Sequence, residues 1–169
     1  RRTRQIVFRQ MTTYRKEIEA AARARDLDPD LVEAIVATES SYRTDAFRHE
    51  PAFWRRYMSR DSRWKDANPR RVSSSYGLMQ VMYFVALERG YPPQSPPEGL
   101  FVPGTGLQFG CRQLKFLFDS EEDWADEIEA VLAQYNGGRR GNRANKVKGD
   151  ERNAAYAAKV LSAYHSIRA

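Results

Sequence analysis

The sequence predicts an all-α fold. Apolar residues recur every three or four positions in several segments, which is the period of a helix with one buried face. No segment shows a convincing alternation of apolar and polar residues, and no internal repeat is visible. At 169 residues, with 41% hydrophobic and 30% charged, the chain is long enough for one domain with a sizeable core.

Composition excludes several classes of function. No apolar run approaches the roughly 18 residues that a membrane-spanning helix needs. Cys111 is the single cysteine and is expected to be buried, so no intramolecular disulfide forms; His49 and His165 lie far apart. We therefore expect no metal and no organic cofactor. The net charge of +6 favours an anionic partner, such as nucleic acid, acidic lipid or acidic glycan.

The first predicted helix covers residues 3–27, with apolar residues along one side and a basic, solvated opposite side. The second begins at Asp28 and Pro29, which suit an N-cap and the first helical position. Its apolar residues recur at helical spacing from Leu31 to Thr38. The N-terminus lacks an initiator Met and an apolar export segment, so we expect a processed or trimmed chain.

Glu39 lies near the end of this second helix, on the same side as Val32, Ile35 and Val36. Burial and the negative end of the helix dipole both disfavour a carboxylate there, so both should raise its pKa. A general acid needs such an environment near neutral pH. The alternative is that Glu39 and the serines after it point into water.

The stretch 43–75 mixes aromatic and basic residues, with a short helix expected from Pro51 to about Arg60. These side chains could stack on sugars or bases, or form a small satellite core with snorkelling arginines. A loop is expected over 91–106, which holds five of the eight prolines. Further helices are expected from the Ser-rich turn at 73–83 to Glu88 or Arg89, at 105–118, at 121–135 before Asn136-Gly137-Gly138, and from Arg152 to Ile167.

Three separated motifs line up along the chain: Glu39-Ser40, Gly77-Leu78-Met79-Gln80 and Ala133-Gln134-Tyr135-Asn136-Gly137-Gly138. In this order they resemble the soluble lytic transglycosylases and goose-type lysozymes, over roughly residues 25–165. Tyr156 with Val160 and Leu161 resembles the final-helix pattern of the transglycosylase branch. The resemblance implies a lysozyme-like helical fold and cleavage of peptidoglycan between N-acetylmuramic acid and N-acetylglucosamine.

The same resemblance implies roles for individual residues. Glu39 is the expected catalytic acid, and Tyr135 is the expected catalytic neighbour that hydrogen-bonds it. A tyrosine hydroxyl orients a carboxylate without adding charge, so the carboxylate stays protonatable. The residues expected to support the acid or bind the substrate are Ser40, Gly77, Met79, Gln80, Asn136 and Tyr156.

Hydrolysis of a glycoside normally needs two carboxylates, and the motifs supply one. In the transglycosylase branch Glu39 would act first as acid and then as base toward the substrate's own C6 hydroxyl. This closes a 1,6-anhydro ring and makes the enzyme a lyase. We expect one catalytic domain over 1–169, with the helix at 1–27 packed on it and 43–75 as an insertion. Its partner would be peptidoglycan glycan strands in the periplasm or cell envelope, and the chain would be a monomer.

Other functions remain open at this point. A goose-type muramidase would hold a water with a second acid from the insertion: Asp45, Glu50, Asp61 or Asp66. A basic helical nucleic-acid-binding module fits the charge and the aromatic residues, but explains neither Glu39 nor Tyr-Asn-Gly-Gly, so no nucleic acid is expected. A peptidoglycan-binding domain without activity would leave Glu39 without a role.

Overall fold

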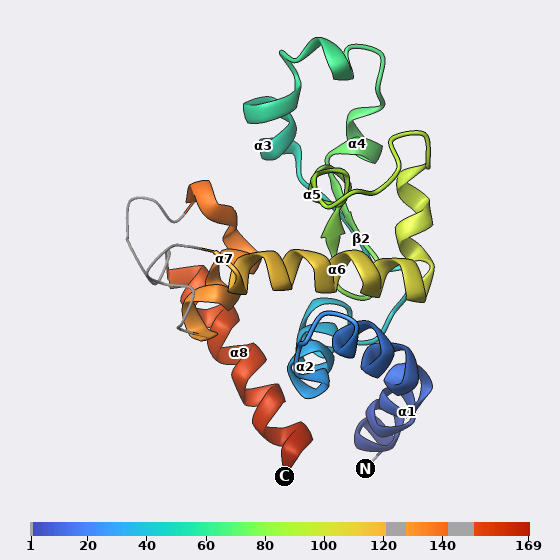
Figure 1. Ribbon diagram of the computed structural model, residues 1–169, viewed down its shortest axis with the longest axis vertical. Helices are drawn as coiled ribbons and strands as arrows, with labels where there is room; N and C mark the ends of the chain where they lie inside the picture. Colours follow the sequence, from blue (N-terminus) through green and yellow to red (C-terminus); the bar gives the residue numbers. More distant parts are fainter. Residues whose placement is uncertain (1, 121–127, 142–150) are drawn as a thin grey trace.

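The computed structural model describes residues 2–120, 128–141 and 151–169, with side chains described over 13–120, 128–137 and 153–169. The chain is mostly helical (Figure 1). Its long helices are α1 (Arg2–Arg23), α2 (Pro29–Ser40), α6 (Pro103–Phe118), α7 (Ile128–Gly141) and α8 (Glu151–Arg168). Within this described part, no helix is both long and apolar enough to cross a membrane.

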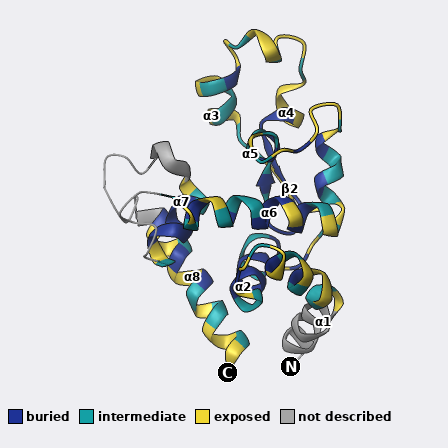
Figure 2. Cartoon of the chain, in the orientation of Figure 1, coloured by how far each residue is buried: buried dark blue, intermediate teal, exposed yellow. Residues whose placement is uncertain are grey.

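Helix α6 runs across the middle of the molecule and packs against α1 and α7 (Figure 1). Helix α2 packs against α1 and α8, and α7 against α8. Buried side chains from α1 to α8 form one hydrophobic cluster, in which Cys111 is fully buried as predicted (Figure 2). The predominantly helical architecture expected from the sequence is therefore confirmed.

A small antiparallel sheet is the main departure from the predicted all-α fold. Its strands β1 (Phe47–His49), β2 (Ser74–Tyr76) and β3 (Val81–Met82) lie in the order β1-β2-β3. The expectation of no strands was wrong because each strand has only two or three residues. Strand β2 is moreover buried at every position, so it cannot show the alternation of a half-buried strand.

The stretch 73–83, predicted as a Ser-rich turn that opens a helix, instead holds β2, β3 and their connection, and the helix α5 (Tyr83–Glu88) begins only at its end. Gly77 has φ +72°, and a Cβ there would lie 2.5 Å from the carbonyl oxygen of Leu100. Its N–H donates to the carbonyl of Ala46 at 2.8 Å. Only glycine fits this close approach, which seats the connection against the rest of the domain.

The segment between β1 and β2, most of the stretch predicted as an insertion, forms a lobe at one end of the long axis (the insertion lobe), and both chain termini lie at the other end (Figure 1). Its elements are α3 (Pro51–Phe53), the π-helical turn η1 (Trp54–Met58), the 3₁₀ turn η2 (Ser62–Trp64) and α4 (Pro69–Val72). Phe53 contacts Phe84 edge-on, and Trp64 contacts Tyr83 in the same way. These aromatic side chains therefore pack on α5 and against the main hydrophobic cluster rather than in a separate satellite core.

Other boundaries also differ from the predictions. The 3₁₀ turn η3 (Pro97–Phe101) and the start of α6 occupy part of the segment predicted as a loop. Helix α7 continues to Gly141, although Asn136-Gly137-Gly138 was predicted to end it. The predicted start of that helix, at 121–127, lies outside the described residues.

Candidate active site

Glu39 occupies the last turn of α2. The Asp28 side chain caps the start of this helix by accepting from the N–H of Asp30 at 2.9 Å, and Pro29 takes the first position, as predicted. The helix ends at Ser41, whose left-handed backbone (φ 50°) turns the chain away. Glu39 is partly buried at this helix end.

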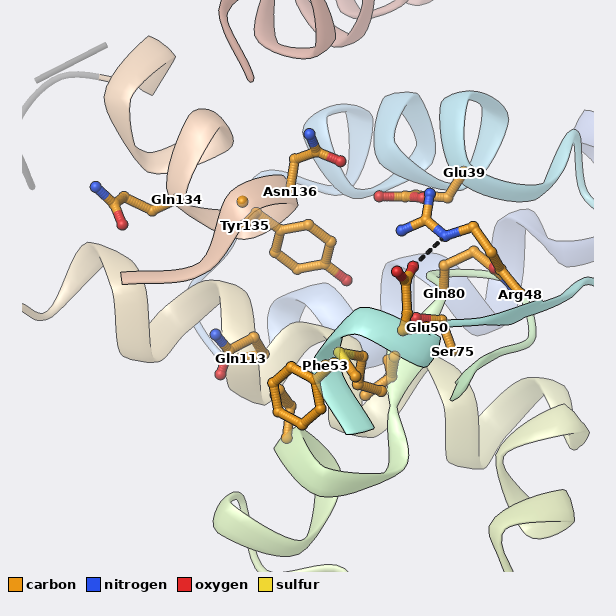
Figure 3. A pocket seen from close by; sticks show the side chains of 14 residues that line it. Glu39, Arg48, Glu50, Phe53, Ser75, Gln80, Gln113, Gln134, Tyr135 and Asn136 are labelled. Atoms are coloured by element: carbon orange, nitrogen blue, oxygen red, sulfur yellow. Dashed lines mark ion pairs between the residues drawn. The ribbon is translucent and has the colours of Figure 1, made fainter. Parts of the chain in front are cut away.

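Two hollows meet at Glu39. The first, about 270 Å³, reaches from Glu39 to α7 (Figure 3). The second lies toward the segment between α2 and β1, and Glu39, Arg48 and Gln80 line both. A chain of sugar rings laid through both hollows would therefore pass Glu39 at their junction.

The surroundings of Glu39 favour its protonated form. Burial raises the pKa of this carboxyl above its ordinary value, while the hydrogen bond from Tyr156 and the charges of Arg48 and Lys159 lower it by less. Lys159 is exposed, so water screens its charge. Glu39 thus combines a raised pKa with access to a cavity, as a general acid requires.

The two tyrosines of the motifs, Tyr135 and Tyr156, differ in their hydrogen-bond partners. The Tyr156 hydroxyl donates to Glu39 Oε1 at 2.8 Å. The Tyr135 hydroxyl donates to the Met79 carbonyl at 2.9 Å, so the predicted hydrogen bond from Tyr135 to Glu39 was wrong. Burial raises the pKa of both phenols well above the usual value, so both remain neutral donors.

The Gly77–Gln80 connection is tied to α2 through Ser40. Its hydroxyl contacts the Leu78 carbonyl at 2.8 Å and the Val36 carbonyl at 3.0 Å, both within hydrogen-bond distance. Gln80 Nε2 donates to the carbonyls of Ala46 and Gly77, which fixes the side chain in the wall of both hollows. Ser40 therefore fixes the position of the Gly77–Gln80 connection relative to Glu39.

Asn136 and Gly137 of α7 contact Asn153 of α8. Asn136 Nδ2 donates to Asn153 Oδ1 at 2.8 Å, and Asn153 is buried. A Cβ on Gly137 would lie 2.2 Å from Asn153 Nδ2. This close approach requires glycine after Asn136, and it sets the spacing of the helices that carry Tyr135 and Tyr156.

The structure brings most of the predicted site residues to the hollows. Those that line one or both are Glu39, Ser40, Gln80, Tyr135 and Asn136. Gly77, Met79 and Tyr156 do not line either hollow. Met79 is fully buried, and a Cβ on Gly110 would meet its sulfur at 2.3 Å. Met79 thus belongs to the core, with its carbonyl accepting from Tyr135.

Arg48 and Glu50 also line the cavity, although no motif in the sequence assigned a specific role to Arg48. Arg48 Nε and Glu50 Oε1 form an ion pair of 2.5 Å. Their spacing is the signal that could have found them, because residues two apart in extended backbone share one side, and Glu50 directly follows β1. The other candidate acids, Asp45, Asp61 and Asp66, lie outside the two hollows that meet at Glu39 and pair with Arg43, Arg63 and Lys65 respectively.

Helices α2, α7 and α8 and the small sheet, gathered around one carboxyl group, define a lysozyme-like helical domain. A sequence profile of the transglycosylase SLT domain matches residues 16–158. The chain therefore belongs to the transglycosylase SLT domain family, and the resemblance read from its motifs is confirmed.

The chain is also similar to a solved structure, the 70 kDa soluble lytic transglycosylase Slt70 from Escherichia coli. The TM-score is 0.64 at 18% sequence identity, and the match covers 92% of this chain but 24% of Slt70. The chain thus spans about a quarter of that protein's length, and the likeness establishes a shared fold. No curated protein sequence matches the chain.

Proposed function

We propose that this domain is a peptidoglycan lytic transglycosylase. It cleaves the β-1,4 bond between N-acetylmuramic acid and N-acetylglucosamine and leaves a 1,6-anhydro end on the muramic acid. Membership of the transglycosylase SLT domain family supports the reaction class. The observation that carries the proposal is Glu39, a carboxyl with a raised pKa at the junction of two hollows lined by the family's motif residues.

In the first step Glu39 donates its proton to the glycosidic oxygen as the bond from that oxygen to C1 of the muramic acid breaks. The acetamido group of the substrate stabilises the developing positive charge at C1, as in substrate-assisted glycosidases. Glu39 is then a carboxylate that accepts the hydrogen bond from Tyr156. A charge-assisted hydrogen bond of this kind stabilises the intermediate state.

In the second step the Glu39 carboxylate accepts the proton of the C6 hydroxyl while the C6 oxygen bonds to C1. The ring closes, no water is consumed and Glu39 regains its proton. Catalysis by one carboxyl therefore requires that it both lose and regain a proton easily. Burial raises the pKa, and the Tyr156 hydrogen bond lowers it, so these opposing effects keep both forms accessible.

We assign the substrate contacts to the polar residues of the hollows. Gln80, fixed through its Nε2, presents Oε1 as an acceptor for a sugar hydroxyl or amide. Asn136 and Tyr135 line the first hollow, and Ser40 lines the second. Because the substrate is the cell wall, the domain acts in the cell envelope, and in a Gram-negative cell in the periplasm.

A second candidate function is hydrolysis by a muramidase mechanism. The observation that favours it is Glu50, which lines the same cavity as Glu39. Glu50 would hold a water for attack at C1, and the product would carry a reducing muramic acid end. Glu50 already forms an ion pair with Arg48, and a water held for attack would have to compete with that contact.

Mass spectrometry of muropeptides released from purified sacculi tests the proposal. The transglycosylase releases anhydro ends, which are lighter than reducing ends by one water. A Glu39→Gln protein is the control for contaminating activity. Reducing ends from the wild-type protein would contradict the transglycosylase and support the muramidase.

A further inference from the structure

The Arg48–Glu50 pair is built into the wall of the cavity opposite the end of α2. Arg48 lies in β1, where it pairs with Ser75 of β2. The N–H of Glu50 donates to the Ser73 carbonyl at 2.9 Å. The backbone of both residues is therefore fixed by the small sheet, and their side chains emerge on the same side.

In Figure 3 Arg48, Glu39 and Glu50 lie at the same end of the cavity, and a dashed line joins Arg48 to Glu50. The guanidinium of Arg48 pairs with Glu50 at 2.5 Å, and its charge also acts on Glu39. Arg48 is the residue of this pair that lines both hollows. It thus lies at the junction where the proposed reaction takes place.

We propose that Arg48 is a positioning residue for this reaction. Glu50 holds its guanidinium beside Glu39, where the positive charge stabilises the carboxylate that remains after proton donation. The inference rests on the proposed acid and base roles of Glu39, and it adds a charge pair to what the family motifs contain.

The pair works because its two charges oppose each other. Arg48 alone would favour an ionised Glu39 and weaken it as an acid. Glu50 partly neutralises the charge of Arg48, so the protonated form of Glu39 stays accessible. With 59% of its side chain exposed, Arg48 acts weakly in the free protein. Bound substrate excludes water from the hollows, and the same charges then act more strongly.

Other groups near Glu39 do not replace this pair. Tyr156 and Tyr135, from α8 and α7, are neutral because burial raises their pKa values. Lys159 of α8 is exposed and screened. Arg43 lines the second hollow, but its side chain is 66% exposed and pairs with Asp45 at 3.9 Å. Among the described residues that line the first hollow, Arg48 supplies the positive charge.

The test is the pH profile of kcat/KM for Arg48→Gln and Glu50→Gln. Loss of the proton on Glu39 sets the alkaline limb of this profile. Arg48→Gln removes a cation, so the limb moves to higher pH by about half a unit. Glu50→Gln removes a like charge and releases Arg48 toward Glu39, so the limb moves to lower pH by about the same amount. The double variant returns close to wild type.

A matched control is Arg63→Gln. Like Arg48, Arg63 forms an ion pair of 2.5 Å with an acid two residues away, Asp61. This pair lies in the insertion lobe and outside both hollows. The Arg63→Gln variant should leave the alkaline limb in place. A carboxyl NMR titration of Glu39 in the same variants gives a readout that does not depend on activity.

The proposal is overturned if the alkaline limb moves in the same direction in Arg48→Gln and Glu50→Gln. It is also overturned if the limb stays in place in one or both of these variants. Complete loss of activity in Glu50→Gln with full activity in Arg48→Gln also overturns it, since Glu50 would then act directly on the substrate. Opposite shifts together with reducing ends from the wild-type protein would leave this proposal standing while the transglycosylase fails. The two failures are therefore distinguishable.

Discussion

Two glutamates on helix α2, Glu33 and Glu39, differ in what surrounds them. Glu33 is 1% exposed and forms an ion pair with Arg15, which also binds Asp30 at 2.8 Å. The Tyr42 hydroxyl lies 3.4 Å from Glu33 Oε1. Glu39 is more exposed, yet its hydrogen-bond donor is the neutral Tyr156. The deeper carboxylate is thus neutralised by a cation, whereas the shallower one is held by an uncharged group.

The comparison shows that burial alone does not make a glutamate a candidate acid. A buried carboxylate that pairs with arginine has its charge balanced within the fold, and removing one partner leaves the other unpaired. A partly buried carboxyl with a neutral donor keeps a raised pKa and can exchange a proton. The following changes break or sharpen this difference.

The largest effect is expected from Glu39→Gln. Gln keeps the shape but cannot donate or accept the reacting proton, so the rate of wall solubilisation should fall by roughly 10²–10⁴-fold. In the folded protein the pKa of Glu39 is raised, so ionisation of Glu39 lowers the stability of the fold as pH rises from its ordinary pKa through the raised one. Gln removes this effect, and the melting temperature at neutral pH should be unchanged or higher. A folded variant with near wild-type activity would remove Glu39 from the mechanism.

The corresponding change at the other glutamate is Arg15→Met. It leaves Glu33 buried without its cation and should lower the free energy of unfolding by about 3 kcal/mol, the low end for a buried pair because Arg15 is 33% exposed. Urea unfolding measures this loss. Activity per folded molecule should be unchanged.

The double variant Arg15→Met/Glu33→Gln should recover much of that stability, because no unpaired charge remains. Arg23→Met is the surface control: Arg23 lies 3.8 Å from Glu19 and is 73% exposed, so its loss should change stability by less than about 1 kcal/mol. An equal loss in both arginine variants would contradict the role given to Glu33.

Tyr156→Phe tests the neutral donor. The Tyr156 hydrogen bond lowers the pKa of Glu39, so its loss should raise that pKa and move the alkaline limb of kcat/KM to higher pH. The weaker stabilisation of the carboxylate should lower kcat about tenfold. Tyr135→Phe is the matched comparison, since its hydroxyl binds the Met79 carbonyl; it should reduce stability by about 1 kcal/mol without moving the limb. A shift in Tyr135→Phe alone would reverse the assignment.

The smallest effect is expected from Ser40→Ala. The buried Leu78 carbonyl loses its hydroxyl donor, so the free energy of unfolding should fall by about 1 kcal/mol, with the pH profile unchanged. Ser166→Ala is the control, because the Ser166 hydroxyl bonds the Ser162 carbonyl at an exposed position of α8. Thermal melts compare the two. Equal melting temperatures would contradict the anchoring role of Ser40.

Local sequence signals predicted α2 well. Asp28, Pro29 and the apolar spacing that follows act within one helix, so they could be interpreted without knowing the rest of the fold. The same signals placed Glu39 at the helix end. They could not single out Glu33, because its partner Arg15 is 18 residues away on another helix.

The tyrosine contacts depend on packing that no local pattern contains. Tyr156 reaches Glu39 across 117 residues of sequence, and the close approach of Gly137 to Asn153 sets how α7 lies on α8. The order of the motifs therefore predicted the family but assigned the hydrogen bond to the wrong tyrosine. The Arg48–Glu50 pair was missed for a related reason, since Arg48 lies in a strand of three residues, too short to predict, and Glu50 directly follows it.

The most direct test of the central claim is a carboxyl NMR titration of protein labelled with ¹³C-glutamate. We predict one glutamate that titrates clearly above the usual value of about 4.3 and is missing from the Glu39→Gln spectrum. If the resonance lost in Glu39→Gln instead titrates at or below that value, Glu39 is an ordinary ionised carboxylate and the account of the site is contradicted.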